Sequence, residues 1–143
     1  MRGICCWAPG SERARAHTRI VSIVDRYLEH ARIFCFCNGG APLVYLASAD
    51  WMSRNLDRRV ELMIPLEEPK LARRAMDILS ACFRDNTQAS LICTDGTSTP
   101  LTPEAEPPFR MQEYLQRQAQ QHAGARERNS RTSLEPHLPK SSS

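Results

Sequence analysis

The sequence predicts one mixed α/β domain, in which a group of strands precedes a helix and a further strand. Short apolar and β-branched runs recur up to Pro65, and the apolar spacing then changes to the helical period. The turn sequence Asn38-Gly39-Gly40 separates two of these runs. A chain of 143 residues with 41% hydrophobic residues can bury one modest core. We therefore expect a mixed β-sheet with flanking helices.

The strands of this sheet are predicted from the apolar runs in chain order. The segments between them are polar, so we expect a loop at residues 11–18, a short charged link with a helical turn at residues 25–30, and irregular structure at residues 51–58. Pro65 ends the last run of the group. The predicted strands are Gly3–Trp7, Arg19–Val24, Arg32–Cys37, Leu43–Ala47 and Val60–Ile64.

The residues after Pro65 predict a helix. Glu67, Glu68 and Pro69 are residue types that the first turn of a helix favours, and Asp85-Asn86 gives a stop signal. The apolar positions with helical spacing between these signals are Leu71, Ala75, Ile78, Leu79 and Cys82.

The remaining residues predict one more strand, a linker and a second helix. Ala89–Cys93 is a short strand, Thr97–Pro108 is a linker rich in Thr and Pro, and Phe109–Gln121 can form a helix with one apolar side. The residues from 122 to 143 are polar and lack aromatic side chains, so we expect a disordered tail. The predicted domain therefore covers residues 1–121.

Composition excludes some classes of function. A formal net charge of +3 argues against a dedicated nucleic-acid-binding arm. Of the 19 basic residues all but Lys70 and Lys140 are Arg, whose guanidinium group suits bidentate phosphate contacts. A codon bias toward arginine would give the same count. No run reaches the roughly 18 apolar residues of a membrane span, and residues 1–10 lack the organisation of a secretory signal.

The 6 cysteines are interpreted as reduced, mostly buried thiols of a cytosolic protein. Cys35 and Cys37 lie in one apolar run, and Cys5 and Cys6 lie in another. Neither pair has the C-x-x-C spacing of a zinc site, so we expect no metal centre. A disulfide framework of a secreted protein is the alternative that the count allows.

The residues that could carry chemistry are concentrated between His30 and Glu61. His30 and Arg32 would leave the same face of an extended segment, and an imidazole beside a guanidinium suits an anion such as phosphate. Asp50 follows a predicted strand, where ligand sites are common, and Asn55 lies in the Arg-rich stretch beyond it.

Each of these residues also has an ordinary structural interpretation. His30 could be a surface or core residue, Asp50 could cap the turn before Trp51, and residues 54–59 could be a solvated loop with local ion pairs. Asn38-Gly39-Gly40 is a hairpin turn, because no phosphate-binding glycine motif follows it. Residue chemistry alone therefore indicates a small α/β domain with a candidate anion site.

Two long segments carry a resemblance to a known family. Ser22–Ile33, with the sequence SIVDRYLEHARI, and Val44–Glu61, with the sequence VYLASADWMSRNLDRRVE, resemble signatures of the long, histidine-dependent polyphosphate kinases. Arg2–Cys6 resembles the segment that precedes them, and Phe109–Gln112 resembles a later family position, as do Asp85-Asn86 and Asp95-Gly96. The resemblance covers residues 2 to about 121 and identifies the chain as the C-terminal catalytic domain of such an enzyme.

The resemblance implies a fold and a reaction. The family transfers the terminal phosphate of ATP to polyphosphate, reversibly and with Mg²⁺, and its catalytic half resembles two phospholipase-D-like domains. By motif, His30 and Arg2 match a histidine and an arginine that face the nucleotide phosphates. Arg2 would then clamp phosphate oxygens, and His30 would donate a hydrogen bond or a proton. Arg32, Asp50 and Asn55 would position these groups.

The resemblance also implies what this chain lacks. The domain that carries the phosphohistidine, the regions before it and the residues tied to Mg²⁺ have no counterpart here, and Cys37 replaces a usual Glu. We therefore expect a truncated gene, a split gene or a misplaced start site. The implied partners are ATP, polyphosphate, the missing domains and further copies of the enzyme. The implied location is cytoplasmic or peripheral to a membrane. A half-site without activity, a module that only binds, and a relic that does not fold are the alternatives.

Overall fold

The computed structural model describes residues 18–129, and of residues 124–129 it describes only the backbone. The predicted strand Gly3–Trp7 lies outside the described residues. The described strands are β1 (Val21–Ile23), β2 (Ile33–Phe36), β3 (Leu43–Ala47), β4 (Met63–Pro65), β5 (Ala89–Ile92) and β6 (Ser98–Pro100). The helices are the 3₁₀ turn η1 (Asn38–Gly40), α1 (Ser53–Arg58), α2 (Pro69–Arg84) and α3 (Met111–Asn129). The predicted α/β class with flanking helices is confirmed.

The described strands form two antiparallel sheets, although one sheet was expected. One has the order β1–β5–β6 and the other has the order β2–β3–β4. In the second sheet Ile33 pairs with Leu46, and Leu46 pairs with Ile64 on its other side. The two sheets are separate because β1 pairs with β5, far along the chain, and not with β2, and α2 connects β4 to β5. Pro65 is tolerated in β4 because this strand lies at the edge of its sheet.

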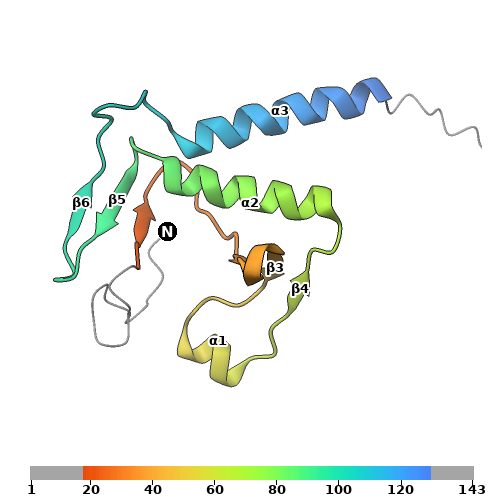
Figure 1. Cartoon of the computed structure of the whole chain (residues 1–143), viewed down its shortest axis with the longest axis horizontal. Coiled ribbons are helices and arrows are strands. Elements are labelled where there is room, and N and C mark those ends of the chain that lie inside the picture. Colours follow the sequence, from red (N-terminus) through yellow and green to blue (C-terminus); the bar gives the residue numbers. More distant parts are fainter. Residues whose placement is uncertain (1–17, 130–143) are drawn as a thin grey trace, which may run out of the picture.

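Helix α2 connects the two sheets and packs against both β2 and β3. Figure 1 shows α3 lying beside α2, with the β1–β5–β6 sheet at the left of the view, where α3 begins. The buried apolar residues among those described are few and mostly small: Val44, Ala75, Ala81, Ala89 and Met111. Pro69 begins α2 as predicted, and Asp85 is the residue that caps its C-terminus.

The turn between β2 and β3 has the backbone that its sequence predicted. Asn38, Gly39 and Gly40 have φ angles of 40°, 63° and 100°. Glycine adopts such left-handed angles without steric cost, and asparagine tolerates them better than most residues. The Asn38 side chain also donates a hydrogen bond to the carbonyl of Ala41, at 3.1 Å.

Several predicted boundaries were wrong. Residues 25–30 form no helical turn, and the Tyr27 backbone and the Asp25 carboxylate bond instead to Gln112 and Arg110. Residues 53–58 form α1, where irregular structure was expected, because the amides of Asn55 and Leu56 bond to the Met52 carbonyl. The expected linker contains β6, and α3 continues past residue 121 to Asn129 through residues that include good helix formers. Residues 130–143 lie outside the described residues.

Candidate functional site

His30 lies on the segment that connects the two sheets, between the end of β1 and the start of β2. Its side chain is exposed, and within the described part of the chain its ring makes no hydrogen bond. The segment itself has no regular secondary structure. The position of the imidazole is therefore set by whatever holds the backbone on either side of it.

Arg32 fixes the backbone of the His30 segment between His30 and β2. Its Nη1 donates to the His30 carbonyl at 2.7 Å, while its Nε and Nη2 donate to Oδ1 of Asp50 at 2.9 and 2.6 Å. The two side chains of this ion pair are 21% and 30% exposed. Most of the guanidinium donors of Arg32 are therefore engaged inside the chain, which suits a positioning role better than direct phosphate binding.

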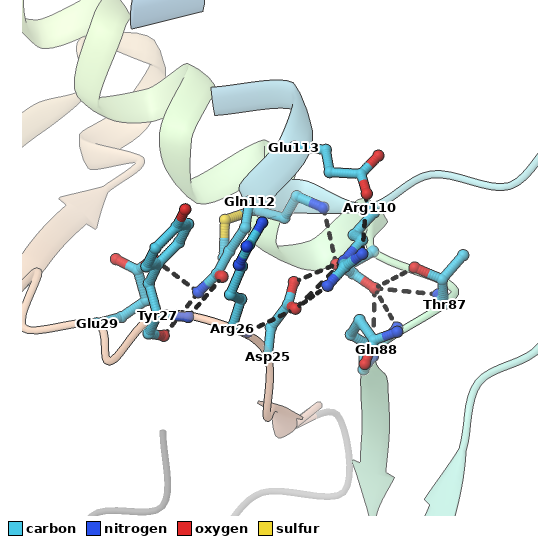
Figure 2. A network of polar contacts seen from close by, with 12 residues as sticks. Asp25, Arg26, Tyr27, Glu29, Thr87, Gln88, Arg110, Gln112 and Glu113 are labelled. Atoms are coloured by element: carbon cyan, nitrogen blue, oxygen red, sulfur yellow. Dashed lines mark hydrogen bonds and ion pairs between the residues drawn. The ribbon is translucent and has the colours of Figure 1, made fainter. Parts of the chain in front are cut away.

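The first turn of α3 fixes the backbone of the His30 segment between β1 and His30 (Figure 2). Gln112 accepts a hydrogen bond from the Tyr27 amide at 2.9 Å and donates one to the Tyr27 carbonyl at 2.7 Å. Its Nε2 also donates to the Glu29 carboxylate at 3.1 Å. One side-chain amide thus satisfies both backbone polar groups of a residue close to His30.

Arg110 and Asp25 form a second link between the same two segments. The guanidinium donates to both carboxylate oxygens of Asp25, at 2.5 to 3.2 Å, and also to Glu113 at 2.8 Å. The Asp25 side chain is 1% exposed, and that of Arg110 is 33% exposed. Hydrogen bonding from Arg110 holds the pKa of Asp25 below its ordinary value, despite the opposing effect of burial.

The carboxylate of Asp85 joins the end of α2, the start of β5 and the start of α3. Asp85 is 1% exposed. Its Oδ1 accepts hydrogen bonds from the amides of Thr87, Gln88 and Ala89, and its Oδ2 accepts one from the amide of Met111 at 2.8 Å. These contacts appear in Figure 2 beside Thr87 and Gln88. The network therefore fixes the helix turn that presents Arg110 and Gln112.

The other predicted site residues lie in different surroundings. Asn55 is 4% exposed, and its Oδ1 is buried with no hydrogen-bond partner among residues 18–129. Arg54, Arg58 and Arg59 are exposed, whereas Arg2 lies outside the described residues. The structure therefore links His30, Arg32 and Asp50 by hydrogen bonds, and among the described residues none of these bonds includes Asn55.

A cavity of about 370 Å³ lies beside the Arg32–Asp50 pair. Its polar lining comes from Glu29, Arg32 and Asp50. Cys82 also lines it, and burial raises the pKa of this thiol, with Glu29 and Asp85 adding to the effect. The apolar lining residues include Ile33, Phe34, Trp51, Ile78, Leu79, Met111 and Leu115.

The described residues contain no cluster of three or more His, Cys, Asp or Glu side chains that could hold a metal ion. The four cysteines among them are free thiols, in agreement with the prediction. The expected burial was wrong for Cys35 and Cys37, because the last two residues of β2, including Cys35, are exposed and Cys37 lies past this strand in the exposed turn. No helix in the described part of the chain is both long and apolar enough to cross a membrane.

Sequence reasoning missed the positioning contacts of α3. The segment Phe109–Gln112 was recognised only as resembling a family position, without roles for its residues. The structure gives Arg110, Met111 and Gln112 each a contact to a distant segment. The available signal was a pair of polar residues, Arg110 and Gln112, at the start of a predicted helix. Their partners could not be predicted, because they lie more than 80 residues away in the sequence.

The fold and the site define a class of protein: a small α/β domain that presents one exposed histidine on a segment fixed by polar contacts at both ends. Comparison with known proteins identifies the family. The family model described as polyphosphate kinase C-terminal domain 2 matches residues 1–112. The chain therefore belongs to this family.

Individual relatives agree with this assignment. A polyphosphate kinase of Rhodopirellula baltica is 42% identical over 97% of this chain, and one of Synechocystis is 48% identical over 73%. The chain spans only 16% and 15% of the length of these relatives. The crystal structure of polyphosphate kinase from Porphyromonas gingivalis superposes with a TM-score of 0.78 at 39% identity, covering 86% of this chain and 19% of that one.

Proposed function

We propose that this chain supplies the second half of a polyphosphate kinase active site, which transfers the terminal phosphate of ATP to polyphosphate. The observation that carries this proposal is the family membership, together with the exposed His30 on a segment fixed at both ends. The relatives from Rhodopirellula baltica and Synechocystis bear the name of this enzyme, and this chain matches a small part of their length.

His30 is the proposed catalytic residue and Arg2 its proposed partner. In phosphoryl transfer the protein contributes mainly positioning and charge stabilisation. An imidazolium at His30 would donate a hydrogen bond or a proton to the transferring phosphoryl group or its bridging oxygen. The guanidinium of Arg2 would hold the phosphate oxygens, an assignment that depends on the resemblance of Arg2–Cys6.

We propose a positioning role, without direct contact to phosphate, for Arg32, Asp50 and Asn55. The contact of Arg32 with the His30 carbonyl supports this for the Arg32–Asp50 pair. The burial of Asn55 supports an internal role and argues against direct phosphate contact.

The remaining half of the site, with its phosphohistidine, is proposed to belong to another catalytic domain. Large apolar side chains on the β2–β3–β4 side support a contact with such a domain: Val60 is 99% exposed and Leu62 is 65% exposed. Assembly into oligomers and a cytoplasmic or membrane-peripheral location are part of the same proposal. Mg²⁺ would accompany ATP, and since the described residues offer no cluster of ligands, we assign no step to it.

The chain alone is proposed to bind phosphate chains without turnover. Half of a site lacks the nucleophile that receives the phosphate, so affinity can remain where catalysis cannot.

Calorimetry on the full chain tests the proposal, with tripolyphosphate and ATP as ligands. We expect His30→Ala and Arg2→Ala each to weaken tripolyphosphate binding by about tenfold, because each removes one charged donor. His122→Ala is the matched control, because His122 is exposed on α3 away from the polar network. Wild-type binding should weaken with salt. Binding that is unchanged by His30→Ala would contradict the proposal, and His30-dependent turnover by the chain alone would contradict its half-site form.

A further inference from the structure

The segment that carries His30 depends on α3 for its conformation. Residues 24–32 connect β1 to β2 without helix or strand, and the Arg32 carbonyl at the end of this segment accepts a hydrogen bond from the Ala47 amide of β3. Such a connection is ordinarily mobile, because little opposes its conformational entropy. Here the Tyr27 backbone and the Asp25 side chain are bonded to the first turn of α3 (Figure 2).

Gln112 acts on the backbone of this segment directly. Its side chain is held in a nearly buried position, with the residue only 6% exposed. It both accepts from and donates to Tyr27, as a neighbouring strand would. Two hydrogen bonds of opposite sense to one residue fix the orientation of both adjoining peptide planes. Rotation of the chain near His30 is thereby restricted.

Arg110 fixes the start of the same segment. Its planar guanidinium binds the buried Asp25 carboxylate in a fork, a geometry that specifies direction as well as distance. Its further contact, to Glu113, orients the guanidinium from the first turn of α3. The segment is thus tied at Asp25 and at Tyr27 on one side of His30, and at Arg32 on the other.

We propose that Arg110 and Gln112 are positioning residues for His30, acting through Asp25 and Tyr27. The proposal rests on the proposed function of His30. The ring of His30 has no hydrogen bond within the described residues, so its location follows from that of its backbone. Since phosphoryl transfer is sensitive to displacements of about 1 Å, a loosened segment would weaken the contact with phosphate.

Hydrogen exchange in the full chain tests the first step without any ligand. We expect Gln112→Ala to speed the exchange of the Tyr27 amide by at least about tenfold, because its buried acceptor is removed. Amides of β2 and β3 should keep their wild-type rates. Arg117→Ala is the matched control, because Arg117 is exposed on the same helix and, within the described part of the chain, bonds only to the Glu113 carbonyl. Unchanged Tyr27 exchange, or equal acceleration throughout β2 and β3, would overturn the proposal.

A double-mutant cycle tests whether the effect reaches His30. We expect Gln112→Ala to weaken tripolyphosphate binding by about tenfold in the wild-type background and by less than about twofold in a His30→Ala background. Equal losses in both backgrounds would mean that Gln112 only stabilises the fold, and would overturn the proposal. If Gln112→Ala fails to fold, Arg110→Lys takes its place, because it keeps the charge but not the fork.

The two proposals fail in different ways. If wild-type binding of tripolyphosphate is independent of His30, the proposed function fails. In that case the exchange rate at Tyr27 still decides whether Gln112 holds the segment. If binding depends on His30 but not on Gln112 or Arg110, the proposed function stands and the positioning role is wrong.

Discussion

The two ends of the molecule differ in how many large apolar side chains they leave exposed. From Asp85 to Gln112, which includes β5, β6 and the first turn of α3, the described residues include no large apolar side chain among the exposed ones. The polar groups there bond to one another. Around β2, β3, β4 and α1 the large apolar side chains that face solvent are Phe36, Leu43, Leu46, Trp51, Leu56, Val60, Leu62, Met63 and Ile64.

This difference contrasts a region whose polar groups are paired within the chain with a region that leaves large apolar side chains exposed. Buried polar groups are tolerated only when hydrogen-bonded, so the Asp85 network is complete within this chain. Extended apolar surfaces usually mark contacts with other domains. His30 lies on the segment that joins the two regions, where an internally fixed scaffold meets a surface that is open to further domains.

The largest effect is expected at Asp85. Asp85→Ala leaves the amides of Ala89 and Met111 buried without an acceptor, so we expect it to lower the free energy of unfolding by about 3–5 kcal/mol. Asp95→Ala is the control, because Asp95 makes a similar contact to the Thr97 amide in an exposed turn and its loss should cost far less. Urea unfolding followed by circular dichroism measures both. Equal losses would show that the network is not the internal anchor of this region.

A smaller and pH-dependent effect is expected at Arg110. The folded-state pKa of Asp25 is lowered by Arg110, so the pair stabilises the fold above the ordinary pKa of an aspartate and the stabilisation is lost as pH falls through the folded value. We expect Arg110→Gln to lower stability at pH 7 and to approach the wild type near pH 3. The measurement is the unfolding midpoint in urea between pH 3 and 7. A difference that stays constant across this range would exclude the ion pair as its cause.

The sequence predicted the elements whose causes are local. Pro69 and the spacing of apolar residues specify α2, and Asn38-Gly39-Gly40 specifies the turn between β2 and β3. The motif resemblance also pointed to candidate site residues, of which Arg32 is hydrogen-bonded to the His30 carbonyl and to Asp50.

Features that depend on distant partners could not be predicted in this way. The conformation of residues 25–30 follows from contacts with Arg110 and Gln112, which local propensity cannot contain. The division into two sheets is likewise a matter of long-range pairing, such as that of Val21 with Leu91. The burial of the cysteines was misjudged for a related reason. An apolar run predicts that a strand is partly buried, but it does not show which end of the strand is buried.

The last prediction concerns the cysteines, whose labelling rates compare the two regions without affecting the stability of the fold. Cys35 and Cys37 are exposed at the open sheet, whereas Cys82 on α2 is partly buried with a raised pKa. Since the thiolate is the reactive form, we expect an alkylating reagent at pH 8 to label Cys35 and Cys37 at least about tenfold faster than Cys82. Mass spectrometry of digested samples locates the label, and the urea-unfolded chain, in which all thiols should react alike, is the control. If Cys82 is labelled as fast as Cys35, the cavity beside Arg32 and Asp50 must open to solvent. The opening motion would then lie next to the segment that carries His30, and not at the β2–β3–β4 sheet.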